Sequence, residues 1–442
     1  MKRVLVAVNG VSAENASFAL SRALEKSGCQ ITYLGSYHNR DRICAQGFTF
    51  LGIEEPPFVK EMSDTSSMNF WRKFRTHVHN AFRMRNYIYL SIEKCLDKVK
   101  PDLVLLDAKL FDFSAPFLKS KIPIIQLNSN LSCCCHSLMQ LPPVFSSIIP
   151  VSILGYRRFA GRCKTILAWL QIIISQKIFL SKMFVFSLAG MGFTHFTSAR
   201  SLVRKYGGLV RHSEYGLRLL APEIVLGPEV IDFPGRKAAL PVHYAGVCVD
   251  EKRRECDFDF DFLAGRGTVI YCSMGTNSSA YLHARRFCEV LMAAMKELHS
   301  CILVMQTEAF AEVPPGISIP DNVFVFPYVP QLQLLQRATL HITHGGFSSV
   351  RESLRYGVPM IVFPGWHDQF GNAARVVFHG VGLRGEMKAI TAETMVAMIK
   401  NILGNSLVFR QVKLKQKELL ESREMDKTVE FVEFYIKQHS VS

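Results

Sequence analysis

The residues with the clearest chemical meaning lie at residues 340–346, where a short apolar run ends in His344, Gly345 and Gly346. Glycine has no Cβ atom, so the backbone can turn sharply there and a phosphate can approach it closely. The sequence that follows predicts a helix beginning directly after the glycines. A helix N-terminus presents free N–H groups and the positive end of the helix dipole, which together bind anions. The segment therefore predicts a phosphate site between a strand and a helix.

Polar side chains in the next two segments extend this predicted site. Ser348 and Ser349 place hydroxyl donors in the first turn of the helix, and Glu352 lies on the same helix face as Ser348. A carboxylate at that place can accept two hydrogen bonds from a ribose diol. A second apolar run is followed by Asp368 and Gln369, an acceptor and an amide that suit sugar hydroxyls. Together these residues predict one half of a nucleotide-sugar site.

Each fragment taken alone also has a simpler interpretation. A His-Gly-Gly segment is often only a turn from a strand to a helix, and an Asp-Gln pair is often part of a solvated loop. Their combination and spacing over residues 342–372 resemble the signature of the family 1 glycosyltransferases. Members of that family use UDP- or TDP-sugars and small lipophilic acceptors. The form of residues 368–372 is most similar to the bacterial macrolide-type members.

A segment before His344 resembles the base-binding part of the same donor site. Tyr328, Val329 and Gln331 precede His344 at the spacing seen in bacterial members of the family. The resemblance implies that Tyr328 stacks on the nucleobase and that backbone groups of Val329 bind the edge of the base. Most relatives carry Trp in place of Tyr328, and a tyrosine there also suits a simple cap on the preceding strand.

The first strand of the second half is followed by Ser273, Gly275 and Thr276, which resemble the family's diphosphate-contacting loop. Any strand-to-helix turn can carry Ser and Gly, so this segment alone is weak support. The acidic alternation at residues 257–261 lies in a linker and is typical of a solvated edge. We therefore expect no metal and no cofactor, with a UDP- or TDP-sugar as co-substrate. His344 and the helix N-terminus are expected to neutralise the leaving UDP.

The first half departs from the family where the catalytic base is expected. Relatives carry His or Asp just before the first helix, and a gapless count back from residues 28–34 places Ala13 there. A shift of one residue brings in Glu14, which serves as a base if burial raises its pKa. Glu14 is equally explained as a carboxylate favoured by a helix N-terminus. Asp107 matches the acid that orients the family's histidine; it can itself be the base, or the acceptor needs little activation.

The elements that must position these residues alternate between short apolar strands and helices. Strands are predicted at residues 4–8, 30–34, 103–106, 122–127, 268–272, 301–305, 323–326, 340–342 and 360–363, and helices at 13–26, 88–98 and 280–298. This alternation predicts an α/β fold with parallel sheets covered on both faces. The resemblance implies the GT-B architecture, in which two Rossmann-like domains face a central cleft. Ligands are expected at the carboxyl ends of the strands.

The length of 442 residues suits two domains. A turn-rich segment marks the join, so we expect an acceptor-binding domain at residues 1–234, with a basic apolar helical insertion, and a nucleotide-sugar-binding domain at residues 235–424. An amphipathic helix at residues 425–442 is expected to cross back to the first domain, as it does in the family. The first residues form a buried-strand pattern without a signal peptide, and the twelve cysteines show no paired metal spacing. A cytoplasmic protein is expected.

Charge gives a second clue about partners. Residues 1–234 hold 29 Lys/Arg and 16 Asp/Glu, so this part carries +13 of the net charge of +15. The stretch 113–213 has no acidic residue and includes apolar runs that Lys177 and Lys182 interrupt too early for a spanning helix of about 20 residues. Such helices suit an anionic membrane surface or the wall of an acceptor pocket, and also an ordinary buried helix. No nucleic-acid-binding module accompanies the charge, so no nucleic acid partner is expected.

Three functions fit these patterns. The first is an inverting glycosyltransferase that moves a glucose-like sugar to a hydroxyl of a lipophilic small molecule. The second keeps this chemistry but uses a membrane lipid or carotenoid-like acceptor, which places the protein at the inner face of the membrane. The third is a catalytically silent GT-B protein that binds a nucleotide sugar, which the missing histidine favours.

Overall fold

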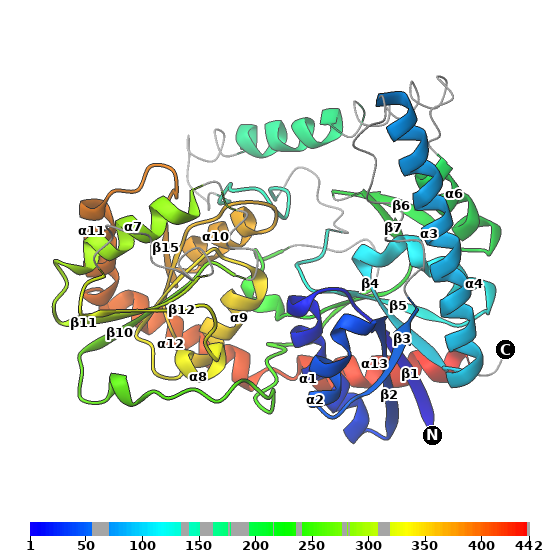
Figure 1. The fold of residues 1–442 in the computed structure, drawn as a ribbon, viewed down its shortest axis with the longest axis horizontal. Helices are drawn as coiled ribbons and strands as arrows, with labels where there is room; N and C mark the ends of the chain where they lie inside the picture. The colour runs from blue at the N-terminus through cyan, green and yellow to red at the C-terminus, as the bar shows by residue number, and fades with distance from the viewer. Residues whose placement is uncertain are drawn as a thin grey trace.

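The protein forms two α/β domains that lie side by side, each built on one parallel sheet (Figure 1). This arrangement confirms the predicted fold class, two Rossmann-like parallel-sheet domains. The computed structural model describes residues 1–54, 70–133, 141–150, 162–175, 177, 194–214, 216–235, 241–275, 281, 283–307 and 319–439.

The sheet of the first domain has seven strands in the order β3-β2-β1-β4-β5-β8-β9, paired in parallel throughout. Its strands are β1 (Lys2–Ala7), β2 (Cys29–Ser36), β3 (Thr49–Ile53), β4 (Leu103–Asp107), β5 (Ile124–Asn128), β8 (Glu223–Val225) and β9 (Val242–Tyr244). Its helices are α1 (Val11–Lys26), α2 (Arg40–Ala45), α3 (Phe70–Val99), α4 (Ser114–Lys119) and α6 (Thr194–Lys205), with short 3-10 turns η1 (Tyr37–Asn39), η3 (Ala108–Phe113) and η4 (Glu229–Ile231). An antiparallel hairpin that the sequence analysis did not predict is formed by β6 (Val210–Ser213) and β7 (Gly216–Leu219).

Helices bury both faces of this sheet, which explains the nearly continuous apolar run of β1. Val4 and Val6 belong to a core cluster with α1, while Leu5 and Ala7 belong to a cluster with α3, α4 and α6. Successive side chains of a strand point to opposite faces, so a strand covered on both sides must be apolar at every position.

The sheet of the second domain has six parallel strands in the order β12-β11-β10-β13-β14-β15. Its strands are β10 (Thr268–Ser273), β11 (Cys301–Gln306), β12 (Val323–Phe326), β13 (Leu340–Thr343), β14 (Met360–Val362) and β15 (Gly382–Arg384). Its helices are α7 (Ala284–Met295), α8 (Gln331–Leu335), α9 (Phe347–Tyr356), α10 (Gln369–Phe378), α11 (Ala392–Leu403) and α12 (Ser406–Glu421), with a 3-10 turn η5 (Asp261–Leu263). Residues 280 and 282 of the helix predicted at 280–298 lie outside the described residues, and the described helix is α7.

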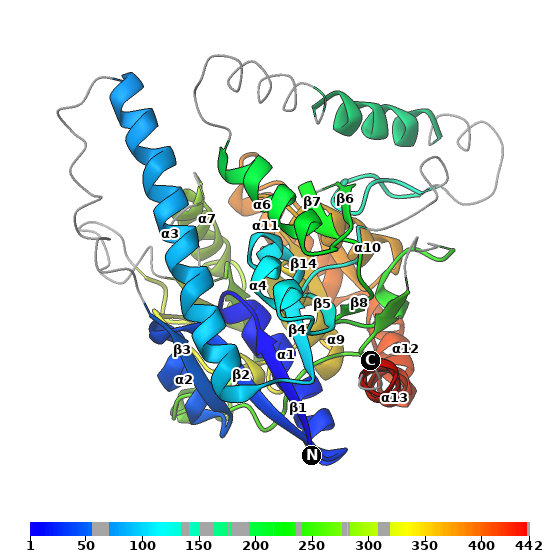
Figure 2. The same ribbon diagram turned by 90° about the vertical axis from the view of Figure 1, so that its right-hand side faces the viewer.

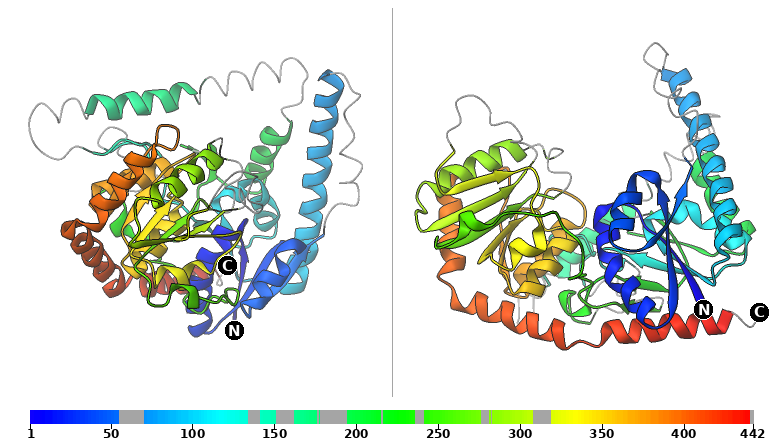
Figure 3. Two further views of the ribbon diagram at one scale, coloured as in Figure 1. Left: turned by 60° about the vertical axis from the view of Figure 1, so that its left-hand side comes forward. Right: turned by 60° about the horizontal axis from the view of Figure 1, so that its bottom comes forward.

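The chain changes domain later than predicted. β9 pairs with β8 in the first sheet, so the first domain continues to Tyr244 and the predicted boundary at residue 234 falls inside it. At the other end of the chain, α12 and α13 (Glu424–His439) run along one side of the molecule from the second domain to the first (Figure 3). Val432 and Ile436 of α13 are buried in the core of the first domain.

The helix α3 is much longer than the segment predicted at residues 88–98. Among its described side chains, those that contribute to the core lie in the C-terminal part and include Ile88, Ile92 and Leu96. Figure 2 shows the N-terminal part of α3 projecting beyond the sheet.

Candidate active site

A polar cavity of about 150 Å³ lies between the domains, at the carboxyl ends of the second sheet. Ten residues predicted for donor binding line it: Ser273, Gly275, Tyr328, Val329, Gln331, His344, Gly346, Ser348, Ser349 and Glu352. Residues that the sequence analysis did not single out also line it: Val11, Ser12 and Asn15 from the first domain, and Arg253, Glu255 and Gln306. Of the other predicted residues, Thr276 lies outside the described residues, and Gly345, Asp368 and Gln369 do not line this cavity.

The ring of His344 packs against two glycines, Gly275 and Gly346. A Cβ atom at Gly275 would lie 2.7 Å from this ring, and a Cβ atom at Gly346 would lie 2.5 Å from it. His344 Nδ1 is 3.5 Å from the carbonyl oxygen of Ser273. Burial lowers the pKa of His344 to about 4, so the ring is neutral at pH 7. The expected neutralisation of UDP by His344 therefore requires a proton taken up when the ligand binds.

The helix α9 begins at the cavity, as a diphosphate site requires. Gly345 has a φ of +79°, and a Cβ there would meet a Val362 side-chain methyl at 2.4 Å, so Gly345 shapes the turn before α9. Ser348 Oγ accepts a hydrogen bond from Arg351 Nη2 at 2.9 Å and lies 2.9 Å from Ser12 Oγ of the first domain. The N-terminus of α9 thus faces the N-terminus of α1 across the cleft.

The carboxylate predicted to bind a ribose diol is held by protein groups. Arg253 Nη1 donates to Glu352 Oε1 at 3.0 Å, and Arg253 Nη2 donates to Glu255 Oε1 at 2.8 Å. Gln331 Nε2 also donates to Glu352. Tyr271 Oη donates to Gln331 Oε1 at 3.0 Å. This network fixes the orientation of Glu352, and a bound ribose has to share Glu352 with Arg253 and Gln331.

Tyr328 and Val329 lie on the cavity wall in different environments. The Tyr328 side chain is 54% exposed, which leaves a ring face accessible to a base, whereas Val329 is buried. The acidic residues of the segment 257–261 are exposed, while Phe258 and Phe260 pack onto the second domain. This confirms the interpretation of that alternation as a solvated edge.

Gln369 holds the loop between β14 and α10. Gln369 Oε1 accepts hydrogen bonds from the backbone N–H groups of Gly365 at 2.9 Å and Trp366 at 3.1 Å, and Gln369 Nε2 donates to Tyr281 Oη at 2.8 Å. A sugar bound by Gln369 would have to replace one of these bonds.

Asp368 makes a different set of contacts. It is half-buried, and its Oδ2 accepts a hydrogen bond from Asn372 Nδ2 at 2.9 Å. Burial raises the pKa of Asp368, and the charge of Lys109 from the first domain opposes that rise. Asp368 therefore lies within electrostatic range of Lys109 in the first domain.

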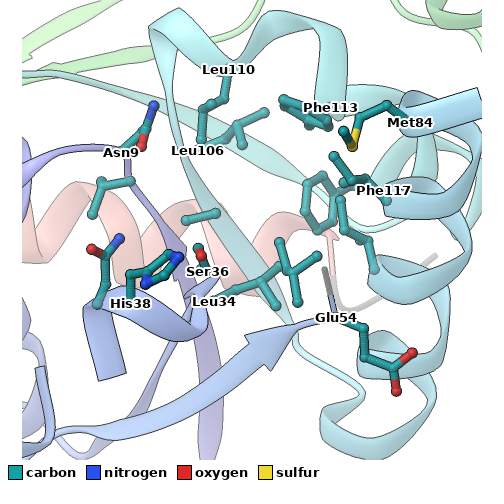
Figure 4. Close-up of a pocket in the computed structure, with 17 residues that line it drawn as sticks. Asn9, Leu34, Ser36, His38, Glu54, Met84, Leu106, Leu110, Phe113 and Phe117 are labelled. Atoms are coloured by element: carbon teal, nitrogen blue, oxygen red, sulfur yellow. The ribbon is translucent and has the colours of Figure 1, made fainter. Parts of the chain in front are cut away.

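A second cavity, of about 500 Å³, lies in the first domain between α3 and the carboxyl ends of β1, β2 and β4 (Figure 4). Figure 4 shows Asn9, Ser36 and His38 at one end of it, and Phe113 and Phe117 at the other. The remaining lining is mainly aliphatic: Ala7, Val8, Leu34, Ile53, Met84, Ile88, Ile92, Leu106 and Leu110, with Gly35, Asn39 and Glu54. The cavity suits a lipophilic molecule that carries a polar group at one end.

Residues of the loop between β1 and α1 line both cavities. Asn9 lines the apolar cavity, whereas Val11 and Ser12 line the polar one. Two residues of extended chain span at most about 7 Å. A polar group at the Asn9 end of the apolar cavity therefore lies next to the polar cavity.

The predicted catalytic residues Glu14 and Asp107 are both buried and hydrogen-bonded to other protein groups. Glu14 is fully buried and receives hydrogen bonds from Arg42, so a substrate cannot reach it, although burial raises its pKa as a base would require. Asp107 is 1% exposed and accepts hydrogen bonds from the backbone N–H groups of Lys109 at 2.9 Å and Asn9 at 3.4 Å. Neither lines a described cavity, so the prediction that one of them is the base is not supported.

Comparison with known proteins places this architecture in a family. The family model described as "UDP-glucoronosyl and UDP-glucosyl transferase" matches residues 220–440, which is half of the chain. The oleandomycin glycosyltransferase of Streptomyces antibioticus is 26% identical over 230 residues, which cover 52% of this chain and 52% of that protein. The uncharacterized UDP-glucosyltransferase YojK of Bacillus subtilis is 29% identical over 179 residues, covering 40% of this chain and 42% of the relative. The chain thus spans about half the length of the curated relatives it matches.

Solved structures agree along the whole chain. The glycotransferase of kitacinnamycin has a TM-score of 0.70 at 18% identity, covering 98% of both chains. The spinosyn forosaminyltransferase SpnP has a TM-score of 0.67 at 15% identity, covering 98% of this chain and 99% of that one. These likenesses show the shared GT-B fold. Together with the matched C-terminal half, they establish that the chain belongs to the family of UDP-glucuronosyl and UDP-glucosyl transferases.

Proposed function

We propose that the protein is an inverting, metal-independent glycosyltransferase that moves a glucose-like sugar from a UDP- or TDP-sugar to a hydroxyl of a lipophilic small molecule. The observation that carries this proposal is that one loop, between β1 and α1, lines two cavities of opposite character. The polar cavity adjoins a helix N-terminus that suits a diphosphate, and the apolar cavity ends in polar groups beside it.

The arrangement supports a single displacement. The diphosphate binds at the start of α9, beside Gly346 and Ser348, with the nucleobase on Tyr328 and the ribose at Glu352. The acceptor oxygen then reaches the anomeric carbon from the first domain, on the side opposite the diphosphate, and the configuration inverts. Among the described residues, no group of three or more His, Cys, Asp or Glu side chains is placed to hold a metal ion.

The names of similar proteins support this substrate class. The spinosyn rhamnosyltransferase SpnG, at 17% identity with a TM-score of 0.63, is known in complex with spinosyn aglycone, and also with thymidine diphosphate. Relatives in Bacillus subtilis are described as UDP-glucosyltransferases. We infer from both groups that this chain uses a nucleoside diphosphate sugar and a small aglycone.

The direct test is UDP release from UDP-glucose with a panel of lipophilic phenols and alcohols in the presence of EDTA, together with calorimetric binding of UDP. We expect turnover that survives EDTA and is lost in His344→Ala. The anomeric configuration of the product, determined by NMR, should be inverted relative to that of the donor sugar. UDP binding without turnover on any acceptor would instead favour a silent nucleotide-sugar-binding protein. No binding of UDP or TDP would contradict the proposal.

A second proposal concerns a membrane surface as partner. The helix at residues 162–175 exposes four large apolar side chains, Leu167, Leu170, Ile173 and Ile174, although Trp169 is buried and its Nε1 donates to the Leu141 carbonyl oxygen at 3.0 Å. Its flanks carry Arg162, Lys164 and Lys177. An exposed apolar face with a basic border suits anionic lipid headgroups. We therefore propose attachment to a membrane surface. No helix among the described residues is long and apolar enough to cross a membrane.

Vesicle co-sedimentation tests the membrane proposal. We expect binding to phosphatidylserine-containing vesicles in low salt, release in high salt, and weaker binding of the double variant Leu170→Ser, Ile174→Ser. Leu407→Ser provides the matched control, because Leu407 is also exposed but lies in α12. Binding that is absent in low salt, or equal in the variant and the control, would exclude this helix as the attachment site. If the double variant no longer binds vesicles but turns over a small phenol at the wild-type rate, membrane attachment and catalysis are separate properties.

A further inference from the structure

The apolar cavity of the first domain, named the acceptor cavity from here on, contains one group suited to accept the proton of an acceptor hydroxyl. Among its described lining residues, His38 and Glu54 are the two whose side chains titrate. Glu54 lies away from the polar end, is 54% exposed, and interacts with Tyr87 Oη at 3.3 Å and Lys94 Nζ at 3.9 Å (Figure 4). These two contacts hold the Glu54 carboxylate at the rim, away from the polar end of the cavity.

His38 occupies the opposite end, nearest to the donor site. It lies in the turn η1 after β2, on the same side of the cavity as Asn9 (Figure 4). Asn9 is two residues before Val11, which lines the polar cavity, named the donor cavity from here on. An acceptor whose apolar body fills the space around Phe113 and Phe117 therefore presents its hydroxyl to His38 and to the sugar together. Imidazole is the side chain best matched to proton transfer near neutral pH.

We propose that His38 is the general base of the transfer, an inference that rests on the proposed function. The acceptor O–H bond breaks and its proton passes to a ring nitrogen of His38. The acceptor oxygen forms a bond to the anomeric carbon, and the bond from that carbon to the diphosphate oxygen breaks. The electron pair of that bond leaves with the nucleoside diphosphate. His38 is exposed, so the proton then passes to water after product release.

Glu14 and Asp107 acquire positioning roles in this arrangement. Arg42 connects the buried carboxylate of Glu14 to Asn39, donating to Asn39 Oδ1 at 3.0 Å, and Asn39 is adjacent to His38. Asp107 holds the backbone N–H of Asn9. The two carboxylates therefore fix the two chain segments, the η1 turn and the β1–α1 loop, that form the polar end of the acceptor cavity.

The test compares His38→Gln with His299→Gln, a matched control because His299 is also an exposed histidine, in a turn of the second domain. Each protein is assayed with an aliphatic alcohol and with a phenol acidic enough to be ionised at the assay pH. We expect His38→Gln to lower kcat for the alcohol by about 10²- to 10⁴-fold and to leave UDP affinity unchanged. The ionised phenol needs no base, so its turnover should fall less than tenfold. The acid limb of kcat/KM against pH for the alcohol should also disappear.

Several outcomes would overturn the assignment. Unchanged turnover of the alcohol by His38→Gln shows that another group accepts the proton. Equal losses for both acceptors show a structural role. A wild-type protein that binds UDP but turns over no acceptor removes the proposed function, and His38 as base with it. Glu14→Gln adds an independent check: it should lower kcat for the alcohol less than His38→Gln does while retaining the acid limb.

Discussion

At the scale of single residues, the charge of His344 should depend on the ligand. In the free protein the pKa of His344 is lowered to about 4 by burial, so the ring is neutral between pH 5 and 7. A diphosphate beside it stabilises the protonated form and raises this pKa. Protons are then taken up on binding wherever the pH lies between the two values, and affinity for UDP rises as pH falls through that range. Calorimetry at one pH in buffers of different ionisation enthalpy measures the uptake directly.

The phosphate of UDP also titrates in this range, with a second pKa of about 6. The control must therefore separate protonation of His344 from protonation of the nucleotide. His344→Gln keeps a side chain of similar reach but cannot be protonated. We expect its proton uptake to be smaller than that of the wild-type protein and its affinity to depend less on pH. Equal uptake in both proteins would place the proton on the nucleotide, and His344 would then act only as a neutral hydrogen-bonding group.

At the scale of elements, α10 and the segment 141–150 of the first domain make a contact that leaves no room for a side chain. A Cβ atom at Gly371 would lie 2.0 Å from the carbonyl oxygen of Val144, which also accepts a hydrogen bond from Arg375 Nη1 at 2.8 Å. Because the clash is with backbone, Gly371→Ala must move α10 away from the first domain. We expect a loss of roughly 1–3 kcal/mol, seen as a lower Tm.

Gly35→Ala is the comparison for this variant. A Cβ atom there would lie 3.6 Å from the Phe50 ring, an ordinary contact, so its effect on Tm should be small. If Gly371→Ala melts at the temperature of the wild-type protein, the contact between α10 and residue 144 does not contribute to stability.

The elements also explain which parts of the site the sequence predicts. His344, Gly346, Ser348 and Glu352 belong to one strand–turn–helix unit, so their spacing alone brings them to one cavity wall. Local geometry of this kind can be predicted from a sequence pattern.

Contacts between distant segments were not predicted, for a physical reason. Arg253 pairs with Glu352 across 99 residues of chain, and nothing in the spacing of either indicates the other. His38 reaches the acceptor cavity because β2 lies beside β1 in the sheet, which the sequence does not specify. The sequence suggests Glu14 as a base because a carboxylate lies next to the position expected for the base. Its ion-pair partner Arg42 comes from a separate helix, so the sequence does not indicate that Glu14 is occupied. Such partners follow from packing and strand order, as does the continuation of the first sheet to β9.

At the scale of the whole molecule, the domains are close together and the donor cavity is small. Ligand pockets for molecules of drug size occupy about 300–1,000 Å³, whereas this one has about 150 Å³. The Oγ atoms of Ser12 and Ser348 are 2.9 Å apart and join the two walls of the cleft. We infer that the domains must separate to admit a nucleotide sugar, and that this pair of serines marks the closed position.

A disulfide across this contact should therefore prevent nucleotide binding. In the double variant Ser12→Cys, Ser348→Cys, oxidation is expected to abolish UDP binding by calorimetry, and a thiol reductant should restore it, because the lock keeps the cavity at its closed volume. Loss of two free thiols on oxidation verifies the bond. The single variants and the wild-type protein receive the same oxidant, since Cys44 and Cys256 are also exposed. If the locked protein binds UDP as tightly as the reduced one, nucleotide entry does not require domain separation, and the small cavity must instead expand by side-chain movement around Arg253 and Glu352.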